Sequence, residues 1–133
     1  MTLQLSVTVR NARLDAIETA IGASPTLEIR TGTAPASCAA ADSGAVLATI
    51  TCPSDWLAAA ASGSKALSGT WQDASADGAG TAGHFRIKAG ATCHLQGTVT
   101  ATGGGGDMTL DNVVLAIGQV LNITTFTITD GNA

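Results

Sequence analysis

GHFRIKAGATCHLQGTVTA, residues 83–101, alternates apolar and polar side chains with a period of two. The apolar positions are Phe85, Ile87, Cys93, Leu95 and Val99, and the polar ones are His84, Arg86, Lys88, His94, Gln96, Thr98 and Thr100. This pattern is typical of antiparallel strands that place one face on a core and the other in solvent. We therefore predict two strands here, with the polar side chains pointing outward.

The segment between these strands predicts a hairpin. Ala89, Gly90 and Ala91 form a three-residue loop, with the glycine where a positive φ is required. A loop of this length places Arg86 opposite His94. It also places His84 opposite Gln96.

Further strands are expected on both sides of the hairpin. They cover residues 26–30, 45–52, 65–71, 107–110 and 119–129. In the last of these the apolar positions change phase, and a bulge near Thr124 and Thr125 would turn both halves toward the core. Seven or eight short strands with glycine-rich turns indicate a mainly β fold, an antiparallel jelly-roll-like β-sandwich over residues 26–129.

An N-terminal α-helix is predicted over residues 7–21. Its apolar stripe is Val7, Leu14, Ile17 and Ile21. Ser6 is placed to cap its start and Gly22 to end it. Arg10 falls on the stripe, where it either extends toward solvent from the helix end or contacts a partner. Residues 54–63 fit a short helix or a turn.

Composition narrows the functional classes. The 133 residues fit a single domain, 1–133, and the core must be aliphatic because aromatic residues make up only 3%. A net charge of -4 without any basic run argues against nucleic-acid binding. No segment has the roughly 18 apolar residues that span a membrane. The N-terminus lacks a signal-peptide pattern, so we expect synthesis in a bacterial host cytoplasm, and we expect no disulfide framework from three cysteines.

Four consecutive glycines, Gly103–Gly106, raise the question of a phosphate-binding loop. A P-loop needs a lysine and a hydroxyl residue after its last glycine, followed by a helix. Here Asp107 and Met108 follow, and then a strand. We interpret the glycines as a turn between the strands at 93–101 and 107–110.

Other chemical sites have weak support. His84 and His94 share a face but lack a third zinc ligand, and Cys52 and Cys93 fit small apolar core positions. The acidic stretch 73–78 alternates oxygen ligands but lacks the rest of a calcium loop. With no nucleophile motif or paired acids in view, we predict no enzyme, no catalytic residue, no metal and no cofactor.

Several longer stretches carry a resemblance. RNARLDAIETAIG (10–22), LEIRTG (27–32), AGHFRIKA (82–89), GGGGDMTLDN (103–112) and ITTFTITDGNA (123–133) together resemble small structural proteins of tailed-phage and prophage virions. Some members of that family are capsid cement, or decoration, proteins of the Bordetella-phage type. The resemblance implies a jelly-roll-like fold, a dimer, the major capsid protein as partner, and a place on the capsid exterior.

The shell-contacting surface is a separate question. The N-terminal helix with Arg10 and Arg13, or an edge strand, is our candidate for shell contact. The alternative function is a carbohydrate- or receptor-binding jelly-roll module of a phage head fibre or tail. Such a module would stack sugars on exposed aromatic rings, and only Trp56 and Trp71 could serve, although both fit core positions better.

Overall fold

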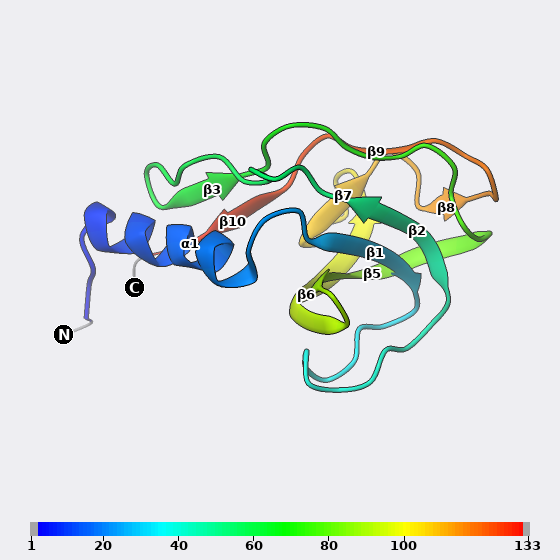
Figure 1. The fold of residues 1–133 in the computed structure, drawn as a ribbon, viewed down its shortest axis with the longest axis horizontal. Helices are drawn as coiled ribbons and strands as arrows, with labels where there is room; N and C mark the ends of the chain where they lie inside the picture. The colour runs from blue at the N-terminus through cyan, green and yellow to red at the C-terminus, as the bar shows by residue number, and fades with distance from the viewer. Residues whose placement is uncertain (1–2, 132–133) are drawn as a thin grey trace.

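The computed structural model describes residues 3–131 and shows a mainly β protein with one N-terminal helix (Figure 1). The predicted domain limits, residues 1 and 133, lie outside the described residues. The elements are α1 (Val7–Ile21), β1 (Thr26–Thr31), β2 (Val46–Thr51), β3 (Ser64–Ala66), β4 (Trp71–Asp73), β5 (Gly80–Ala89), β6 (Thr92–Ala101), β7 (Met108–Leu110), β8 (Val114–Leu115), β9 (Leu121–Ile123) and β10 (Thr127–Thr129).

The main sheet has the strand order β2-β1-β5-β6-β7, and β8 pairs with the start of β5. Two short ribbons, β3–β10 and β4–β9, complete the β structure. Every pair is antiparallel except β6–β7. The curled mixed sheet and its ribbons are consistent with a β-sandwich.

One apolar core joins the sheet, the ribbons and the C-terminal end of α1. Four aromatic rings run through it in sequence, Trp56, Trp71, Phe126 and Phe85, with centroid separations of 5.9, 5.7 and 5.5 Å. Both tryptophans are buried, as expected, and the Trp56 indole N–H donates to the Gly22 carbonyl at the end of α1. The aromatic series therefore links the helix end to the sheet.

The β5–β6 hairpin exists, but its predicted register is wrong by two residues. Arg86 lies opposite Gln96, and His84 lies opposite Thr98. Ala89 pairs with Thr92, which leaves a two-residue loop, and a bulge between Ile87 and Lys88 shifts the register by a further residue. The shorter loop and the bulge each shift the register by one residue, and together they account for the difference of two residues.

The outer face of β5 is covered, contrary to the prediction. His84, Arg86 and Lys88 do alternate with the core residues, yet all three are buried. The segment that covers them, residues 32–45, connects β1 to β2 and is named here the cover segment. Arg86 donates hydrogen bonds to three of its backbone carbonyls and to Asp42.

A disulfide joins the cover segment to the sheet. Cys38 of the segment bonds to Cys93 of β6, across a sequence separation of 55. The expectation of no disulfide, and the placement of Cys93 in the core, are therefore wrong. Cys52 is buried as expected, and burial raises the pKa of its thiol to about 12.

Two predicted strands are interrupted. The expected strand 65–71 divides into β3 and β4, and the expected strand 119–129 divides into β9 and β10. β9 pairs with β4, whereas β10 pairs with β3, so the chain changes partner between Ile123 and Thr127 instead of forming a bulge. Leu121, Ile123 and Phe126 are nevertheless buried, as the phase change predicted.

The helix begins and ends at the predicted residues. The Ser6 hydroxyl accepts from the Val9 N–H, and the Gly22 N–H donates to the Glu18 carbonyl. Leu14 and Ile21 are buried, but Val7 is 46% exposed because the first turn extends beyond the β structure (Figure 1). Residues 54–63 form no helix.

The glycine stretch does connect two strands, but these strands are parallel. Only residues 102–107 separate β6 from β7, although parallel neighbours usually need a crossover of about a dozen residues. The Thr100 hydroxyl accepts from the Gly106 N–H at 2.9 Å, and a Cβ on Gly104 or Gly106 would clash with Thr100. The glycines permit this close approach.

Candidate binding surfaces

The two arginines predicted to contact a shell lie on α1 with different roles. Arg10 is half-buried and donates from Nη1 to the Asp130 carbonyl at 3.1 Å, just after β10. Arg13 pairs through Nε with the Asp130 carboxylate at 3.2 Å, and its side chain is 60% exposed. Arg10 thus holds the helix against the end of β10, and Arg13 is the more accessible cation.

The helix is further fixed by a buried lysine that the sequence analysis did not single out. Lys65 of β3 contacts Asp15 at 2.7 Å and Glu18 at 2.9 Å, and its side chain is 2% exposed. Burial acts to lower the pKa of Lys65, but its hydrogen bonds to the two carboxylates outweigh this and raise it. The same hydrogen bond from Lys65 is the main cause of a lowered pKa of Asp15.

Exposed large apolar side chains gather in two regions. Leu3, Val7 and Val9 form the N-terminal cluster, and Val114, Ile117 and Val120 form the distal cluster around β8 and the start of β9. Figure 1 places the start of α1 and strand β8 at opposite ends of the long axis. The molecule therefore exposes apolar side chains near both of its ends.

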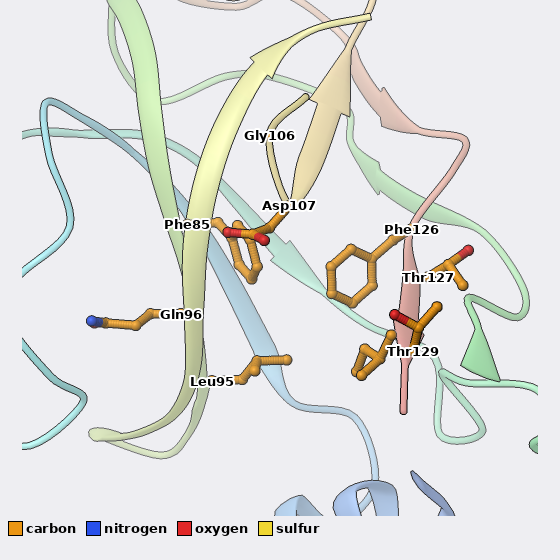
Figure 2. Close-up of a pocket in the computed structure, with 9 residues that line it drawn as sticks. Phe85, Leu95, Gln96, Gly106, Asp107, Phe126, Thr127 and Thr129 are labelled. Atoms are coloured by element: carbon orange, nitrogen blue, oxygen red, sulfur yellow. The ribbon is translucent and has the colours of Figure 1, made fainter. Parts of the chain in front are cut away.

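A groove of about 400 Å³ lies between β6 and β10 (Figure 2). It is lined by Phe85, Leu95, Gln96, Gly106, Asp107, Phe126, Thr127, Ile128 and Thr129. In the view, Leu95 points into the gap from β6 and Phe126 points toward it from the opposite side, whereas Gln96 points away. Apolar side chains therefore point into the groove from both sides, and the rest of its lining is polar or glycine.

Both rims are strand edges without a strand partner among residues 3–131. On one side β7 pairs only with Val99–Ala101, so the first part of β6 has no neighbour there. The Thr98 N–H points to that side, since it donates to Asp107, and the backbone of Gln96 has the same orientation because strand groups alternate.

The other rim is β10, whose opposite edge is occupied by β3. The Phe126 carbonyl accepts from Leu67, and the Asp130 N–H donates to the Gly63 carbonyl. The backbone groups of Phe126, Ile128 and Asp130 thus point toward β3. By alternation, the backbone groups of Thr127 and Thr129 face the groove.

Asp107 closes one end of the groove. Its carboxylate accepts from both the N–H and the hydroxyl of Thr98, at 2.9 and 3.0 Å. A Cβ on Gly97 would clash with Asp107 and Phe85, so the glycine allows the carboxylate to lie against the strand. A second hollow shares Ile128 and Thr129 with the groove and is also lined by Arg13 and Asp130.

A cluster of charges lies beneath the cover segment. It comprises the cations Arg30, Arg86 and Lys88 and the anions Glu28 and Asp42. The hydrogen bond from Lys88 is the largest cause of a lowered pKa of Asp42, and Arg86 and Arg30 act in the same direction against burial. Because every charged partner is engaged internally, the cluster holds the cover segment in place.

The residues considered as metal ligands do not lie together in the structure. His84 is buried, with Nδ1 at 2.9 Å from the Gly32 carbonyl, whereas His94 is exposed. Asp73 and Asp77 both accept from Thr49 on β2. Within residues 3–131, no group of three or more His, Cys, Asp or Glu side chains could hold a metal ion.

No protein-family model matches this chain, and no curated protein or solved structure is significantly similar to it. Within the described part of the chain, the one helix is too short and too polar to cross a membrane.

Sequence reasoning did not find the groove. The signal lay in the phase change at residues 124–125, which marks a change of strand partner. Such a change leaves one edge of β10 unpaired, but only the three-dimensional arrangement shows that this edge faces β6.

Proposed function

We propose that this protein is a structural component of a tailed-phage virion, a capsid cement protein that binds the outside of the icosahedral shell and stabilises it. The proposal starts from the sequence resemblance to phage structural proteins. Its partner is the major capsid protein, and its location is the capsid exterior. The jelly-roll-like form of the sandwich and the absence of enzymatic activity are parts of the same proposal.

The observation that carries the proposal is the pair of apolar clusters at opposite ends of the long axis. A cement protein must bridge neighbouring shell subunits, and this requires two separate contact regions on one rigid body. Each contact can be weak, because repetition over the shell and simultaneous binding at both ends supply avidity. The charge cluster and the disulfide fix the cover segment to β5 and β6.

Of the two arginines, Arg13 is the better candidate for shell contact. Its side chain is largely exposed next to the N-terminal cluster, whereas Arg10 is occupied by the Asp130 carbonyl. Arg13→Gln tests the contact by removing the charge, and it leaves the Arg10 hydrogen bond to the Asp130 carbonyl in place.

The alternative, a carbohydrate- or receptor-binding module of a head fibre or tail, is less well supported. Trp56 is 0% exposed and Trp71 is 1% exposed, so neither ring offers a stacking platform for a sugar. Absence of tryptophan fluorescence quenching by glycans is the expected result.

The bridging proposal is tested on phage heads assembled without this protein. Purified wild-type protein is expected to bind them and to raise the temperature at which they disrupt. Val7→Ser with Val9→Ser alters one end, and Val114→Ser with Ile117→Ser alters the other. Each variant is expected to retain weak binding but to lose the stabilisation, because one end alone cannot bridge.

Exposed residues away from both ends supply the matched control. Thr51→Ser, on the outer edge of the sheet, should bind and stabilise heads like the wild type. Full stabilisation by both end variants would contradict the bridging proposal, and so would failure of the wild-type protein to bind heads at all.

A further inference from the structure

A hollow of about 370 Å³ lies beside the disulfide that joins the cover segment to β6. Cys38 and Cys93 both line it, and both are half-buried. Small side chains form much of the rest of its wall, at residues 39–41 and 91–92. Access is one of the factors that set the rate of thiol–disulfide exchange. The hollow therefore gives a small thiol a route to this bond in the folded protein.

The charges around the disulfide also favour exchange. Arg86 and Asp42 of the charge cluster line the same hollow, and the Arg86 guanidinium donates to the Cys38 carbonyl at 2.9 Å. The cluster contains three cations and two anions, so its net charge is positive. Thiolates are the reactive species in exchange, and nearby positive charge stabilises a thiolate relative to a thiol.

The third cysteine has the opposite surroundings. Cys52 is 1% exposed, and burial raises the pKa of its thiol to about 12. A buried thiol of this kind stays protonated and does not attack disulfides. Cys52 therefore provides an unreactive thiol within the same chain, against which the reactivity of the other two cysteines can be measured.

Contacts on both sides of Cys38 hold the cover segment independently of the disulfide. Before Cys38, Gln96 of β6 donates to the Pro35 carbonyl at 2.7 Å. After it, Arg86 of β5 pairs with Asp42. Neither contact involves a cysteine sulfur, so we expect reduction to leave the segment in place. The two thiols then stay next to each other and re-form their own bond in preference to a lasting bond with a small thiol.

We infer that Cys38 and Cys93 form a thiol–disulfide exchange site for small-molecule thiols and disulfides, which is reduced and oxidised while the protein stays folded. The site gives the chain two folded forms of different stability, and the thiol–disulfide balance of the surroundings selects between them. The inference goes beyond the virion role and does not depend on it.

The reaction proceeds through a mixed disulfide. A thiolate of the reagent attacks one cysteine sulfur, the S–S bond of the protein breaks, and the other cysteine leaves as a thiolate that takes a proton from water. A second reagent thiolate then attacks the reagent sulfur of the mixed disulfide, and the first cysteine leaves in the same way. The protein gains two electrons and two protons, and the reagent departs as its own disulfide. Oxidation by a small disulfide, such as oxidised glutathione, runs the same steps in reverse.

The rate at which dithiothreitol reduces the folded wild-type protein provides the first test. Exchange in the folded state should be first order in dithiothreitol, and its rate should change less than about twofold between buffer and about 1 M urea. Exchange that requires global unfolding would accelerate at least about fivefold over the same range, because urea shifts the unfolding equilibrium by that factor or more. Reduction of oxidised glutathione under the same conditions corrects for the effect of urea on the reagent. An acceleration of that size would overturn the inference.

The reduced protein provides the second test. After removal of dithiothreitol, its circular dichroism should match that of the oxidised protein. An aromatic disulfide reagent should then react with two thiols of the folded protein, and with Cys52 only after denaturation. Reaction of all three thiols without denaturant, or of none, would contradict a site that is open in a folded chain.

Single-cysteine variants identify the two sulfurs. Oxidised glutathione should convert the reduced wild-type protein to the Cys38–Cys93 disulfide, with no glutathione retained. Cys38→Ser and Cys93→Ser each lack the second thiol, so each should keep one glutathione on the remaining partner, detected as an added mass. Cys52→Ala is the matched control and should behave like the wild type. Glutathione on Cys52 instead of the pair, or no adduct on either folded single variant, would overturn the inference.

Discussion

Arg86 illustrates how one side chain determines the surroundings of many others. It is 1% exposed, and its guanidinium binds the Ser37, Cys38 and Ala40 carbonyls as well as Asp42. The planar group with several donors satisfies a loop that has no regular hydrogen bonding of its own. The cover segment therefore depends on a residue that lies more than 40 positions away in the sequence.

Replacing Arg86 should have a large effect on stability. Arg86→Ala removes the guanidinium donors to the Cys38 and Ala40 carbonyls and one of the three cations that bind Asp42, so we expect a loss of about 3 kcal/mol in the free energy of unfolding. Urea denaturation measures this loss. Arg13→Ala, which removes only an exposed ion pair, should cost less than about 1 kcal/mol. Equal effects of the two substitutions would show that the charge cluster does not hold the cover segment.

The lowered pKa of Asp42 predicts how the stability of the folded state depends on pH. Its folded-state pKa lies below the ordinary value of 3.8, so the unfolded state binds protons more readily than the folded state does. The stabilisation is therefore complete above pH 3.8 and is lost as the pH falls through the lowered pKa. Asp42→Asn should flatten the acid limb of a stability–pH profile. An unchanged acid limb in that variant would assign the effect to other carboxylates.

The sequence predicted residue environments well where alternation alone decides them. Phe85 and Ile87 are buried, and Ser6 and Gly22 cap the helix as expected. The prediction that His84, Arg86 and Lys88 are exposed was wrong. A period of two separates the two faces of a strand, but it does not reveal that a distant loop covers the polar face. The sequence analysis also missed Val7, since a helical stripe does not show where the helix extends past its support.

Among the elements, the crossover between β6 and β7 depends most directly on glycine. Gly106→Ala should destabilise the protein by about 1–3 kcal/mol, because its Cβ would meet the Thr100 side chain at 2.8 and 2.9 Å. Gly131→Ala is the control, since nothing lies within 4 Å of a Cβ there. Thermal and urea denaturation compare the two. Similar stabilities would mean that the crossover relaxes without cost.

The disulfide predicts a second effect at the level of elements. Replacing Cys38 and Cys93 by serine removes a cross-link with a sequence separation of 55, which loop-closure entropy values at about 4 kcal/mol. Denaturation with and without a reductant measures the difference, and the reductant should have no effect on the double variant. Reductant-insensitive stability of the wild-type protein would contradict a disulfide in the folded state.

The strands themselves were largely predictable, but their partners were not. The period of two located β1, β2, β5 and β6 to within a few residues. The breaks within 65–71 and 119–129 were missed because β3 and β4 pair with different parts of the C-terminal segment. Pairing is a long-range property, so local pattern could not show that the edges of β6 and β10 face each other.

At the scale of the whole molecule, the β body exposes apolar side chains near both of its ends and has a groove between β6 and β10. Neither feature involves the charge cluster, whose members bind one another. The proposed virion role starts from the sequence resemblance. The apolar side chains at the two ends give this proposal a physical basis, which the end variants test.

The central claim is that this protein coats a phage shell, and quantitative mass spectrometry of purified, intact heads tests it most directly. The measured quantity is its copy number relative to the major capsid protein. A cement role predicts a fixed ratio with copies over the entire shell, comparable in number to the shell subunits or their pairs. A few copies per particle, or none, would contradict it.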